Sequence, residues 1–349
     1  MIPTTQKAVV ITEEGCVLHD TGVPKPGVED ILVKVAAAAQ NPTDWKTADR
    51  GKKIGAIVGC DFVGTVVEIG SNVPAGVRSV GERVAGFVQG ALYPNGSFSE
   101  YLTAPAQVVV HVPDSWSDED AAQLGIAPFT AAQTLWSSQV NFPTPLAPSS
   151  TSPPTPLLVS AGSSSVGQYV IQFAKLSGFR VLAFASPKNF DLVRSLGADE
   201  VFNYKDPEAS KKVRDATQGQ LKFAVDTFCE KQTPKQVADA LSDEGGVVSA
   251  ILPYQSVREN IKVVNSIAYT LLGKNLNFPM KFTATELETA RGRKYAQLLS
   301  DVLATGKIKP NPTRVFPKGL ASVPEGLQYM RDGKVSGEKI TYRIADTPK

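Results

Sequence analysis

Short runs of apolar, mostly β-branched residues separated by glycine turns make up the chain to about residue 115. The runs are KAVVI, EDILVKV, GTVVEIG, GERVAGFV and QVVVHVP. Such short runs between turn residues are typical of strands with a buried face. We therefore predict an all-β, barrel-like module for this part of the chain.

From about Leu157 the pattern changes to strands that alternate with amphipathic helices. The strand LLVSA precedes the helical VGQYVIQFAKLSG, and the strand RVLAFAS precedes the helical NFDLVRSLG. Farther along, the strands KFAVDTF and VVSAIL flank the helix TPKQVADALSDEGG, which two glycines close. Repeated strand–helix units predict a parallel sheet of the doubly wound kind.

The chain after about Glu286 contains one helical stretch, TARGRKYAQLLSDVLATG, and a final strand, EKITYRI. We expect this lone strand to return to an earlier sheet. Between the two main patterns, residues 141–156 include six prolines and six serines or threonines. That composition predicts an extended loop, which is either a passive surface insertion or a segment near the substrate entrance.

The length of 349 residues suggests two domains. The 36 Lys and Arg nearly balance the 34 Asp and Glu, so the net charge of +2 favours neither nucleic acid nor a membrane as a partner. Three cysteines, Cys16, Cys60 and Cys229, suit a reducing compartment. The start of the chain has no long apolar region, and the apolar stretch 31–39 is too short to span a membrane. These features predict a cytoplasmic protein.

The segment LLVSAGSSSVGQYV follows the dinucleotide-binding fingerprint, with Gly162, Ser164 at the middle glycine position, and Gly167. Gly162 is expected to allow the sharp turn, and Gly167 the close approach of helix and strand. Ser164 is small enough to keep the backbone near a pyrophosphate, and the serine hydroxyls lie where a helix N-terminus attracts anions. The residues assigned to the cofactor here are Gly162, Ser163, Ser164, Ser165, Val166 and Gly167.

The end of the second strand of this unit indicates which dinucleotide is bound. NAD sites usually carry an Asp or Glu there, whereas this chain has SPKN at 186–189. Ser186, Lys188 and Asn189 can all donate to a 2′-phosphate that a carboxylate would repel, so we predict NADPH. Tyr204 and Lys205 close the next strand and could join this pocket. Alternatively, Lys188 and Lys205 are solvated surface charges.

The whole chain resembles the medium-chain dehydrogenase/reductase superfamily. The resemblance rests on NPTD (41–44), GCDFVGTVVEIG (59–70), GERV (81–84), GSFSEY (96–101) and AGSSSVG (161–167). It implies an α/β protein with a GroES-like β-barrel catalytic domain, residues 1–125 and 288–349. A Rossmann NADPH-binding domain with a doubly wound parallel sheet would then span residues 126–287.

Zinc enzymes of this superfamily need a Cys, a His and a further Cys or Asp at the metal. Here Gln40 or Asn41 occupies the first ligand position, and Cys60-Asp61 replaces the His-Glu pair. The chain has two histidines, both expected on strands as structural or surface residues, which also argues against a Ser-His-Asp hydrolase. We therefore predict no metal and the zinc-free branch of quinone oxidoreductases and enoyl reductases.

A narrower resemblance covers nearly the whole chain. SPKNFDLVRSLGADEVFNY, the Pro/Ser loop and SGEKITYRI are similar to the trans-acting enoyl reductases of fungal polyketide pathways, of the lovastatin type. That resemblance implies NADPH-dependent reduction of an α,β-unsaturated polyketide thioester, delivered by the carrier protein of a polyketide synthase. Because AGSSSVG is closer to the general quinone-reductase turn, a stand-alone quinone or alkene reductase remains an alternative. A catalytically silent NADPH-binding protein is a third.

The same resemblance assigns residues to the site. Lys46 and Thr130 would be catalytic, and further cofactor contacts would come from Thr43, Asp44, Lys46, Ile251, Leu252, Lys339 and Ile340. The substrate would lie along Gly125, Ile126, Ala127, Pro128, Phe129, Thr130, Ala131 and Ala132. Alternatively, Lys46 is a surface lysine, Thr130 is the N-cap of a helix over 131–136, and Ile251 and Leu252 are core residues.

Reduction of an enoyl thioester leaves an enolate whose α-carbon needs a proton. Tyr93 and Tyr101, expected on loops, are candidate donors, but packing roles suit them better, and solvent is the alternative. Docking of an acidic carrier protein would need a basic patch. The candidate patches are Lys211, Lys212 and Arg214, and Arg291, Arg293 and Lys294, unless these are ordinary solvated helix faces.

Overall fold

The structure is a computed structural model that describes residues 1–137, 142–277 and 280–349. It contains two compact units, a first unit of Met1–Ile126 with Tyr269–Lys349 and a second unit of Ala127–Ala268. The chain thus returns to the first unit at Tyr269, earlier than the residue 288 expected from sequence. The reason is local, because the Tyr269 hydroxyl is hydrogen-bonded to Thr43 and Cys60 of the first unit. Within the described ranges, no helix has both the length and the apolar character needed to cross a membrane.

The first unit contains a two-stranded hairpin and a larger sheet of seven strands. The sheet has the order β14-β15-β3-β4-β5-β7, with β6 paired to β3. Its strands and the hairpin are β1 (Thr5–Thr12), β2 (Gly15–Gly22), β3 (Asp30–Ala39), β4 (Asp61–Ile69), β5 (Arg83–Phe87), β6 (Tyr101–Pro105), β7 (Val109–His111), β14 (Thr313–Phe316) and β15 (Lys339–Arg343). Every β-rich run singled out in the sequence before residue 115 overlaps one of these strands, which confirms the runs as strands. The expectation that this part is all-β is wrong at residues 42–51, which form a helix.

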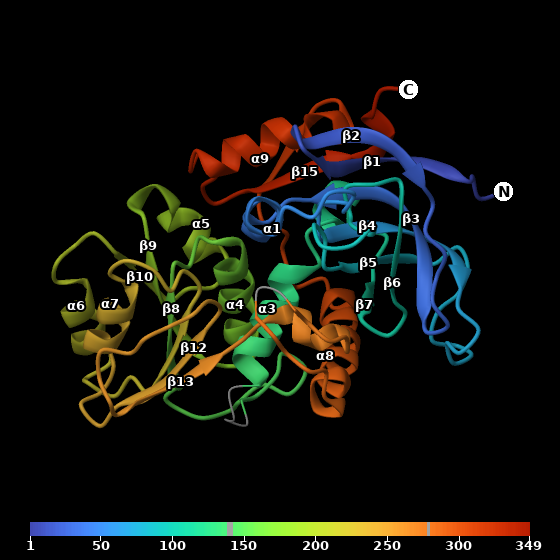
Figure 1. Cartoon of the computed structure of the whole chain (residues 1–349). Helices are drawn as coiled ribbons and strands as arrows, with labels where there is room; N and C mark the ends of the chain where they lie inside the picture. The colour runs from blue at the N-terminus through green and yellow to red at the C-terminus, as the bar shows by residue number, and fades with distance from the viewer. Residues whose placement is uncertain (138–141, 278–279) are drawn as a thin grey trace. The chain divides into compact units, whose positions relative to one another are not determined.

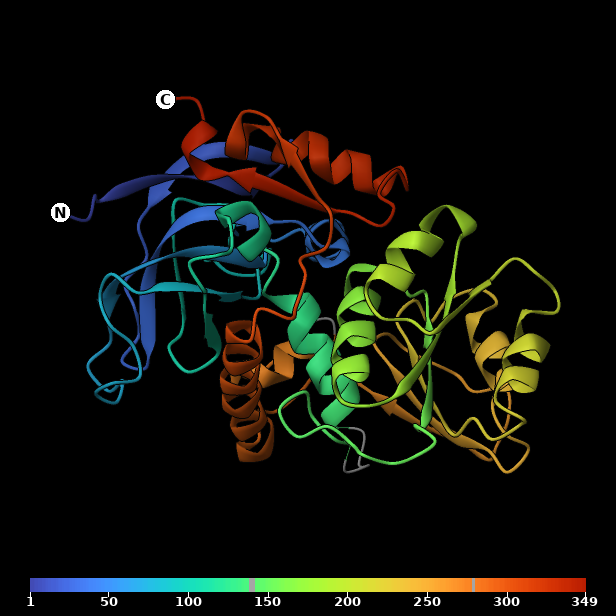
Figure 2. The same ribbon diagram turned by 180° about the vertical axis from the view of Figure 1, so that it is seen from behind.

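The expected return of the C-terminal strand is confirmed. β15 pairs antiparallel with β3, and Thr341 lies opposite Ala39. Two helices precede it in the tail, α8 (Glu286–Ala304) and α9 (Val323–Arg331). Figure 2 shows β15 and α9, in red, beside the blue strands from the start of the chain. The first unit is therefore built from both ends of the sequence.

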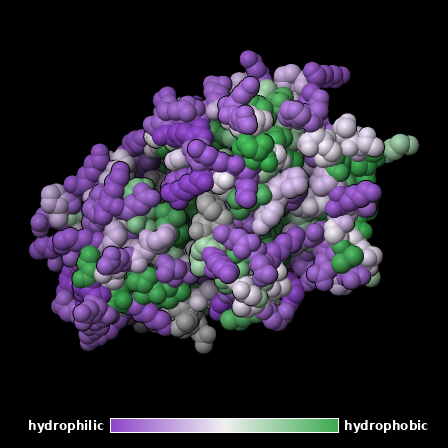
Figure 3. Space-filling view, viewed as in Figure 1, coloured by the Kyte–Doolittle hydropathy of each residue, from purple (hydrophilic) through white to green (hydrophobic). Residues whose placement is uncertain are grey.

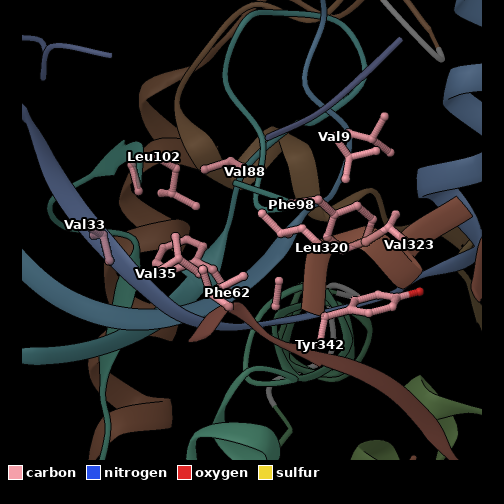
Figure 4. Packing of buried hydrophobic residues seen from close by; sticks show 14 of the residues in the cluster. Val9, Val33, Val35, Phe62, Val88, Phe98, Leu102, Leu320, Val323 and Tyr342 are labelled. Atoms are coloured by element: carbon pink, nitrogen blue, oxygen red, sulfur yellow. The ribbon is translucent and has the colours of Figure 1, made fainter. Parts of the chain in front are cut away.

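A large apolar cluster forms the core of the first unit, and a second, smaller one consists of Ala8, Val10 and Ile57. Figure 4 shows Val9 and Phe98 packed near Leu320 from the C-terminal tail. The rings of Phe98 and Tyr342 meet edge to face with centroids 5.4 Å apart, an arrangement that stabilises aromatic pairs beyond their buried area. Burial of side chains from both chain ends explains why the tail strand belongs to this sheet.

Three short helices of this part of the chain are α1 (Pro42–Gly51), α2 (Asp118–Ala121) and α3 (Ile126–Trp136). Periodicity did not predict α1, because its buried residues are Asp44, Thr47 and Ala48, which form no apolar stripe. Its start is instead set by capping. Asp44 Oδ2 accepts the Asn41 N–H at 2.6 Å, and Pro42 occupies the first turn.

The second unit is a six-stranded parallel sheet of order β10-β9-β8-β11-β12-β13. Its strands are β8 (Pro156–Ser160), β9 (Arg180–Ala185), β10 (Glu200–Asn203), β11 (Phe223–Asp226), β12 (Gly246–Ala250) and β13 (Ile261–Asn265). The helices are α4 (Ser165–Leu176), α5 (Phe190–Ser195), α6 (Ala209–Ala216) and α7 (Thr233–Ala240), and Figure 1 shows them on both sides of the sheet. This is the Rossmann order, with its switch point between β8 and β11.

The proline-rich segment before β8 behaves as a loop over its described part. Residues 142–155 form no named helix or strand, as their composition predicted. Asn141, the first residue of the expected loop, lies outside the described residues. Short 3₁₀ helices complete the chain at η1 (Pro187–Asn189), η2 (Ala268–Leu272), η3 (Gly319–Ser322) and η4 (Ile344–Asp346).

Candidate active site

The glycine turn between β8 and α4 lies at the switch point of the second unit. The residue of this turn with a left-handed backbone is Ala161, with φ of 55°. At Gly162 a Cβ would lie 3.1 Å from Ala183 Cβ, a tight contact that favours glycine at this position. A Cβ on Gly167 would lie 2.5 Å from the Ala161 oxygen, which confirms its role in close packing.

The Ser164 hydroxyl is used by the fold itself. As the N-cap of α4, its Oγ accepts the Gly167 N–H at 2.9 Å. It also lies 2.8 Å from Thr227 Oγ1, whose own proton goes to the Ser160 carbonyl at 2.8 Å. Ser164 must therefore donate to Thr227, and this hydroxyl bridges the turns that follow β8 and β11. Sequence reasoning missed Thr227, although its position directly after the strand beyond the switch point was a usable signal.

The remaining features of the turn suit a bound pyrophosphate. Ser163 and Ser165 are half-buried at the start of α4, a helix of 12 residues whose first N–H groups and dipole attract anions. Ser163 Oγ accepts a hydrogen bond from Asn189 Nδ2 at 3.1 Å, which ties the end of β9 to the turn. Small residues, a close backbone and a helix N-terminus together fit a dinucleotide phosphate.

Ser186 and Tyr204 directly follow two neighbouring parallel strands, β9 and β10, at the carboxyl ends of the strands. Asn203 of β10 is in register with Ala185 of β9, and the Tyr204 N–H donates to the Ala185 carbonyl at 3.3 Å. Lys188 and Lys205 are both exposed beside these strand ends, and the Lys205 ammonium lies 5.9 Å from the centre of the Tyr204 ring. The arrangement fits a 2′-phosphate, while exposure alone also suits solvated lysines.

Ile251 and Leu252 follow the end of β12 and are not part of the core. Ile251 is half-buried, and Leu252 is 38% exposed. The alternative interpretation of these two residues as core is therefore wrong. Apolar side chains left accessible beyond a parallel strand are suitably placed for contact with a ligand at that edge.

A buried ion pair organises the first unit's part of the predicted site. Lys339 Nζ donates to Asn41 Oδ1 at 2.5 Å and to Asp61 Oδ2 at 3.0 Å, and Asp61 Oδ1 accepts the Ile126 N–H at 2.7 Å. Burial raises the pKa of Asp61, which the Lys339 ammonium opposes. A Cβ on Gly125 would lie 2.3 Å from Asp61 Oδ1, so this glycine is needed for the contact.

Three residues predicted to bind the cofactor have buried side chains that serve other purposes: an ion pair, core packing and a helix cap. Lys339 is 2% exposed and held by the ion pair, and Ile340 is fully buried in the apolar cluster. Asp44 is 1% exposed and caps α1. Because these side chains are buried and already in contact with other groups, any cofactor contact from these residues would have to come from the backbone.

The predicted substrate segment forms the first turns of α3. Thr130 is 5% exposed inside the helix, which begins at Ile126, so its alternative role as an N-cap is wrong. Ile126 is half-buried. The other buried members of the segment are Ala127, Pro128, Phe129, Ala131 and Ala132.

A polar chain that the sequence did not reveal surrounds Thr43. The Tyr269 hydroxyl lies 3.1 Å from both Thr43 Oγ1 and Cys60 Sγ, although Tyr269 and Thr43 are 226 positions apart. Burial raises the pKa of both the Tyr269 phenol and the Cys60 thiol well above their usual values. Lys46 is half-buried on the same helix as Thr43, with its ammonium 5.7 Å from the Trp45 ring centre.

The remaining candidate residues from the sequence, two tyrosines and two histidines, take no part in the hydrogen bonds described above. Tyr93 is 45% exposed, and Tyr101 is the first residue of β6 rather than part of a loop. His19 on β2 and His111 on β7 are exposed strand residues, as expected. Across the described part of the chain, no three His, Cys, Asp or Glu side chains come together as a metal site. The absence of a metal remains a prediction.

Five of the six cations in the two candidate basic patches form ion pairs. On α6, Lys211 pairs with Asp215 at 2.6 Å, and Lys212 with Asp206 at 2.5 Å. On α8, Arg291 pairs with Glu288, an acidic residue on the same helix. Hydrophilic residues predominate on the surface toward α6 and α7 (Figure 3). Paired charges on exposed helices favour the interpretation of solvated faces.

Comparisons with known proteins cover nearly the whole chain. Residues 27–114 match the family model of the alcohol dehydrogenase GroES-like domain, and residues 165–284 match that of the zinc-binding dehydrogenases. The trans-enoyl reductase ACTTS2 of Alternaria alternata is 37% identical over 97% of this chain and 99% of its own. The trans-enoyl reductase mpsG of Macrophomina phaseolina is 36% identical over 98% and 99%.

Solved structures share the fold. The CurK enoyl reductase superposes with a TM-score of 0.75 at 17% identity, over 97% of this chain and 99% of its own. The quinone oxidoreductase from Coxiella burnetii gives a TM-score of 0.71 at 21% identity, over the same shares of the two chains. At these identities the likeness concerns architecture, and it agrees with the expected GroES-like and Rossmann folds.

Proposed function

Because the chain belongs to the trans-enoyl reductases of the medium-chain dehydrogenase/reductase superfamily, we propose that it uses NADPH to reduce the conjugated C=C bond of a polyketide enoyl thioester. The observation that carries the proposal is similarity over nearly the full length to proteins named trans-enoyl reductases, at 37% and 36% identity. An oxidoreductase acting on a C=C bond and an NAD(P)-type cofactor follow from this family. NADPH and the polyketide thioester are the finer parts of the proposal.

The second unit would hold the cofactor. The backbone between Gly162 and Gly167 and the start of α4 suit the pyrophosphate, while Ser186, Lys188 and Tyr204 suit the 2′-phosphate. When bound, NADPH supplies the hydride that reduces the β-carbon. The role of this chain is to bind and orient the cofactor, and the fixed backbone of the turn supports that role.

The first unit would hold the enoyl thioester. As its β-carbon is reduced, negative charge develops on the thioester oxygen, so a hydrogen-bond donor or a cation at that oxygen lowers the barrier. Lys46 is half-buried on α1 of the first unit, and we assign it to this task. Thr130 is buried on α3 and belongs to the second unit, so its catalytic role stays a prediction from the sequence. The buried ion pair of Asp61 and Lys339 supports the assignment of Lys46, since Lys339 also donates to Asn41 at the start of α1.

The substrate would arrive on the phosphopantetheine arm of a carrier protein. The relatives' designation as trans-enoyl reductases supports a reductase that acts on a chain held by a separate synthase. The paired charges on α6 and α8 do not support those helices as the docking surface.

The test is turnover with defined substrates. The purified protein is incubated with NADPH and a crotonyl or longer enoyl thioester, beside a small quinone, and oxidation of NADPH is followed. Reduction of the thioester at the higher kcat/KM supports the proposal. Preference for the quinone would instead support a stand-alone reductase, an alternative that the AGSSSVG turn favours. Turnover of neither would favour an NADPH-binding protein.

A further inference from the structure

A continuous polar chain runs through the interior of the first unit to Thr43. The Tyr269 hydroxyl lies 3.1 Å from Thr43 Oγ1 and 3.1 Å from Cys60 Sγ. Asp44 lies beside Cys60, and each of these two groups shifts the pKa of the other. Capping and packing explain part of the Asp44 environment, but neither explains why a phenol, a thiol and a carboxyl meet in one buried chain.

The members of this chain differ in their access to the outside. Cys60 and Asp44 are each 1% exposed and Tyr269 is 8% exposed, whereas Thr43 is half-buried. Thr43 is therefore the member through which protons can enter or leave. At the other end, Asp44 Oδ2 accepts the Asn41 N–H, Oδ1 accepts from no donor among the described residues, and the Cys60 thiol is the side chain beside this carboxyl. A buried oxygen without a donor is costly as a carboxylate and much less so as part of a neutral acid, whose proton can pass to the neighbouring thiolate.

We propose that Tyr269, acting through Thr43, delivers the proton that the α-carbon of the reduced substrate requires, with Cys60 and Asp44 as the proton reserve behind it. The inference rests on the proposed function, because it supplies the acid that enoyl reduction needs. Thr43 is the catalytic residue in this scheme, and Tyr269 is a positioning and relay residue. The other ionisable groups near this chain are Asp61 and Lys339, which form their own ion pair, and Tyr342 and Cys16, whose pKa values the Asp44 charge also raises.

The transfer balances without any further reagent. The O–H bond of Thr43 breaks as a C–H bond forms at the enolate α-carbon, and Thr43 takes the Tyr269 proton. Tyr269 takes the Cys60 proton, and the thiolate takes the proton of the Asp44 carboxyl, so the enolate's negative charge ends on Asp44. Burial raises the pKa of Asp44 to about 7, which lets this carboxyl hold a proton near neutral pH. After the product leaves, water reprotonates the chain through Thr43.

The test variant is Tyr269→Phe, which removes one hydroxyl and keeps the ring. Tyr342→Phe is the matched control, since Tyr342 is a buried tyrosine of the same unit whose hydroxyl bonds to Gln40 instead. The enoyl thioester that the wild-type protein reduces fastest is converted in D2O, and the configuration of the deuterated α-carbon is determined by NMR. Wild type and Tyr342→Phe should give one configuration, because deuterium arrives from one side.

For Tyr269→Phe we expect a mixture of both configurations and a kcat lowered at least about tenfold, because solvent replaces a positioned donor. The Kd for NADPH should stay unchanged. A single configuration at unchanged kcat would overturn the inference while leaving the proposed function intact. If the wild-type protein reduces no enoyl thioester, the proposed function fails and the inference fails with it.

A second measurement needs neither cofactor nor substrate. In protein labelled with ¹³C at tyrosine Cζ, the Tyr269 signal should shift in Thr43→Val and in Cys60→Ala, because each variant removes one of its hydrogen bonds. The same signal should keep its position in Tyr342→Phe. An unmoved Tyr269 signal in both of the first two variants would show that the hydrogen-bonded chain does not exist in solution.

Discussion

Lys188 is exposed on η1. Residues 186–189 contain no carboxylate that would repel a phosphate. A charge-assisted hydrogen bond to a phosphate is worth about 1.5–3 kcal/mol, which corresponds to at least about tenfold in affinity. Lys188→Ala should therefore raise the Kd for NADPH at least about tenfold and leave the Kd for NADH nearly unchanged, as measured by cofactor fluorescence.

Lys235→Ala is the control for that experiment, because Lys235 is an exposed lysine of the same unit paired with Asp239. It should change neither affinity. Equal affinity of the wild-type protein for NADH and NADPH would refute the assignment of Ser186, Lys188 and Tyr204 to the 2′-phosphate.

The raised pKa of the buried Asp44 carboxyl should make the free energy of unfolding depend on pH. Burial raises its pKa from 3.8 to about 7 in the folded chain, so between these values the folded state binds a proton that the unfolded state does not. The free energy of unfolding should consequently fall as pH rises through this window. Asp44→Asn removes the titration, so urea unfolding at pH 5 and pH 8 should differ less for the variant than for wild type.

Asp49→Asn serves as the comparison, since Asp49 lies on the same helix but is exposed, with its carboxylate paired to Arg331 and not buried. It should retain the wild-type pH slope. If Asp44→Asn has the same slope as wild type, Asp44 does not titrate in that range, and the reserve at the end of the relay is absent.

At the scale of elements, the buried ion pair of Asp61 and Lys339 joins β4, β15 and the starts of α1 and α3. Lys339→Met leaves the Asp61 charge buried without its partner, which costs about 3–5 kcal/mol of stability. Urea unfolding should show this loss, and thioester reduction should fall because the pair holds the start of α1, the helix that carries Lys46.

Asp61→Asn combined with Lys339→Met should recover part of the stability, because the amide keeps an acceptor for the Ile126 N–H and carries no charge. A double variant as unstable as Lys339→Met alone would mean that the uncompensated charge is not the cause.

At the scale of the whole molecule, the ion pairs on the surface of α6 predict that this helix does not dock the carrier protein. Lys211→Gln with Lys212→Gln removes two positive charges that Asp215 and Asp206 already balance. The rate of reduction of a carrier-bound enoyl chain should therefore stay within about twofold of wild type, even at low salt where surface charges are least screened. A selective loss on the carrier-bound chain, with a free enoyl thioester unaffected, would identify α6 as a docking surface after all.

The local pattern of residues was sufficient to predict many of the secondary-structure elements of this protein. The β-rich runs before residue 115, the alternating units after Leu157 and the glycine turn were all predictable, because strand period, helix period and turn chemistry are set by residues close in sequence. The return of the tail strand to an earlier sheet was predicted because a lone strand needs a partner, while the structure identified β3 as that partner. The helix α1 was missed because a capped polar helix has no apolar period.

What only the tertiary structure decided are the contacts between side chains far apart in the chain. Tyr269 meets Thr43 across 226 positions, and Lys339 meets Asp61 across 278. No local preference encodes such pairs, since their cost and benefit arise from burial, where a polar group must find a partner wherever the fold brings one. For the same reason Lys339, Ile340 and Asp44, assigned from sequence to the cofactor, use their side chains to hold the first unit together.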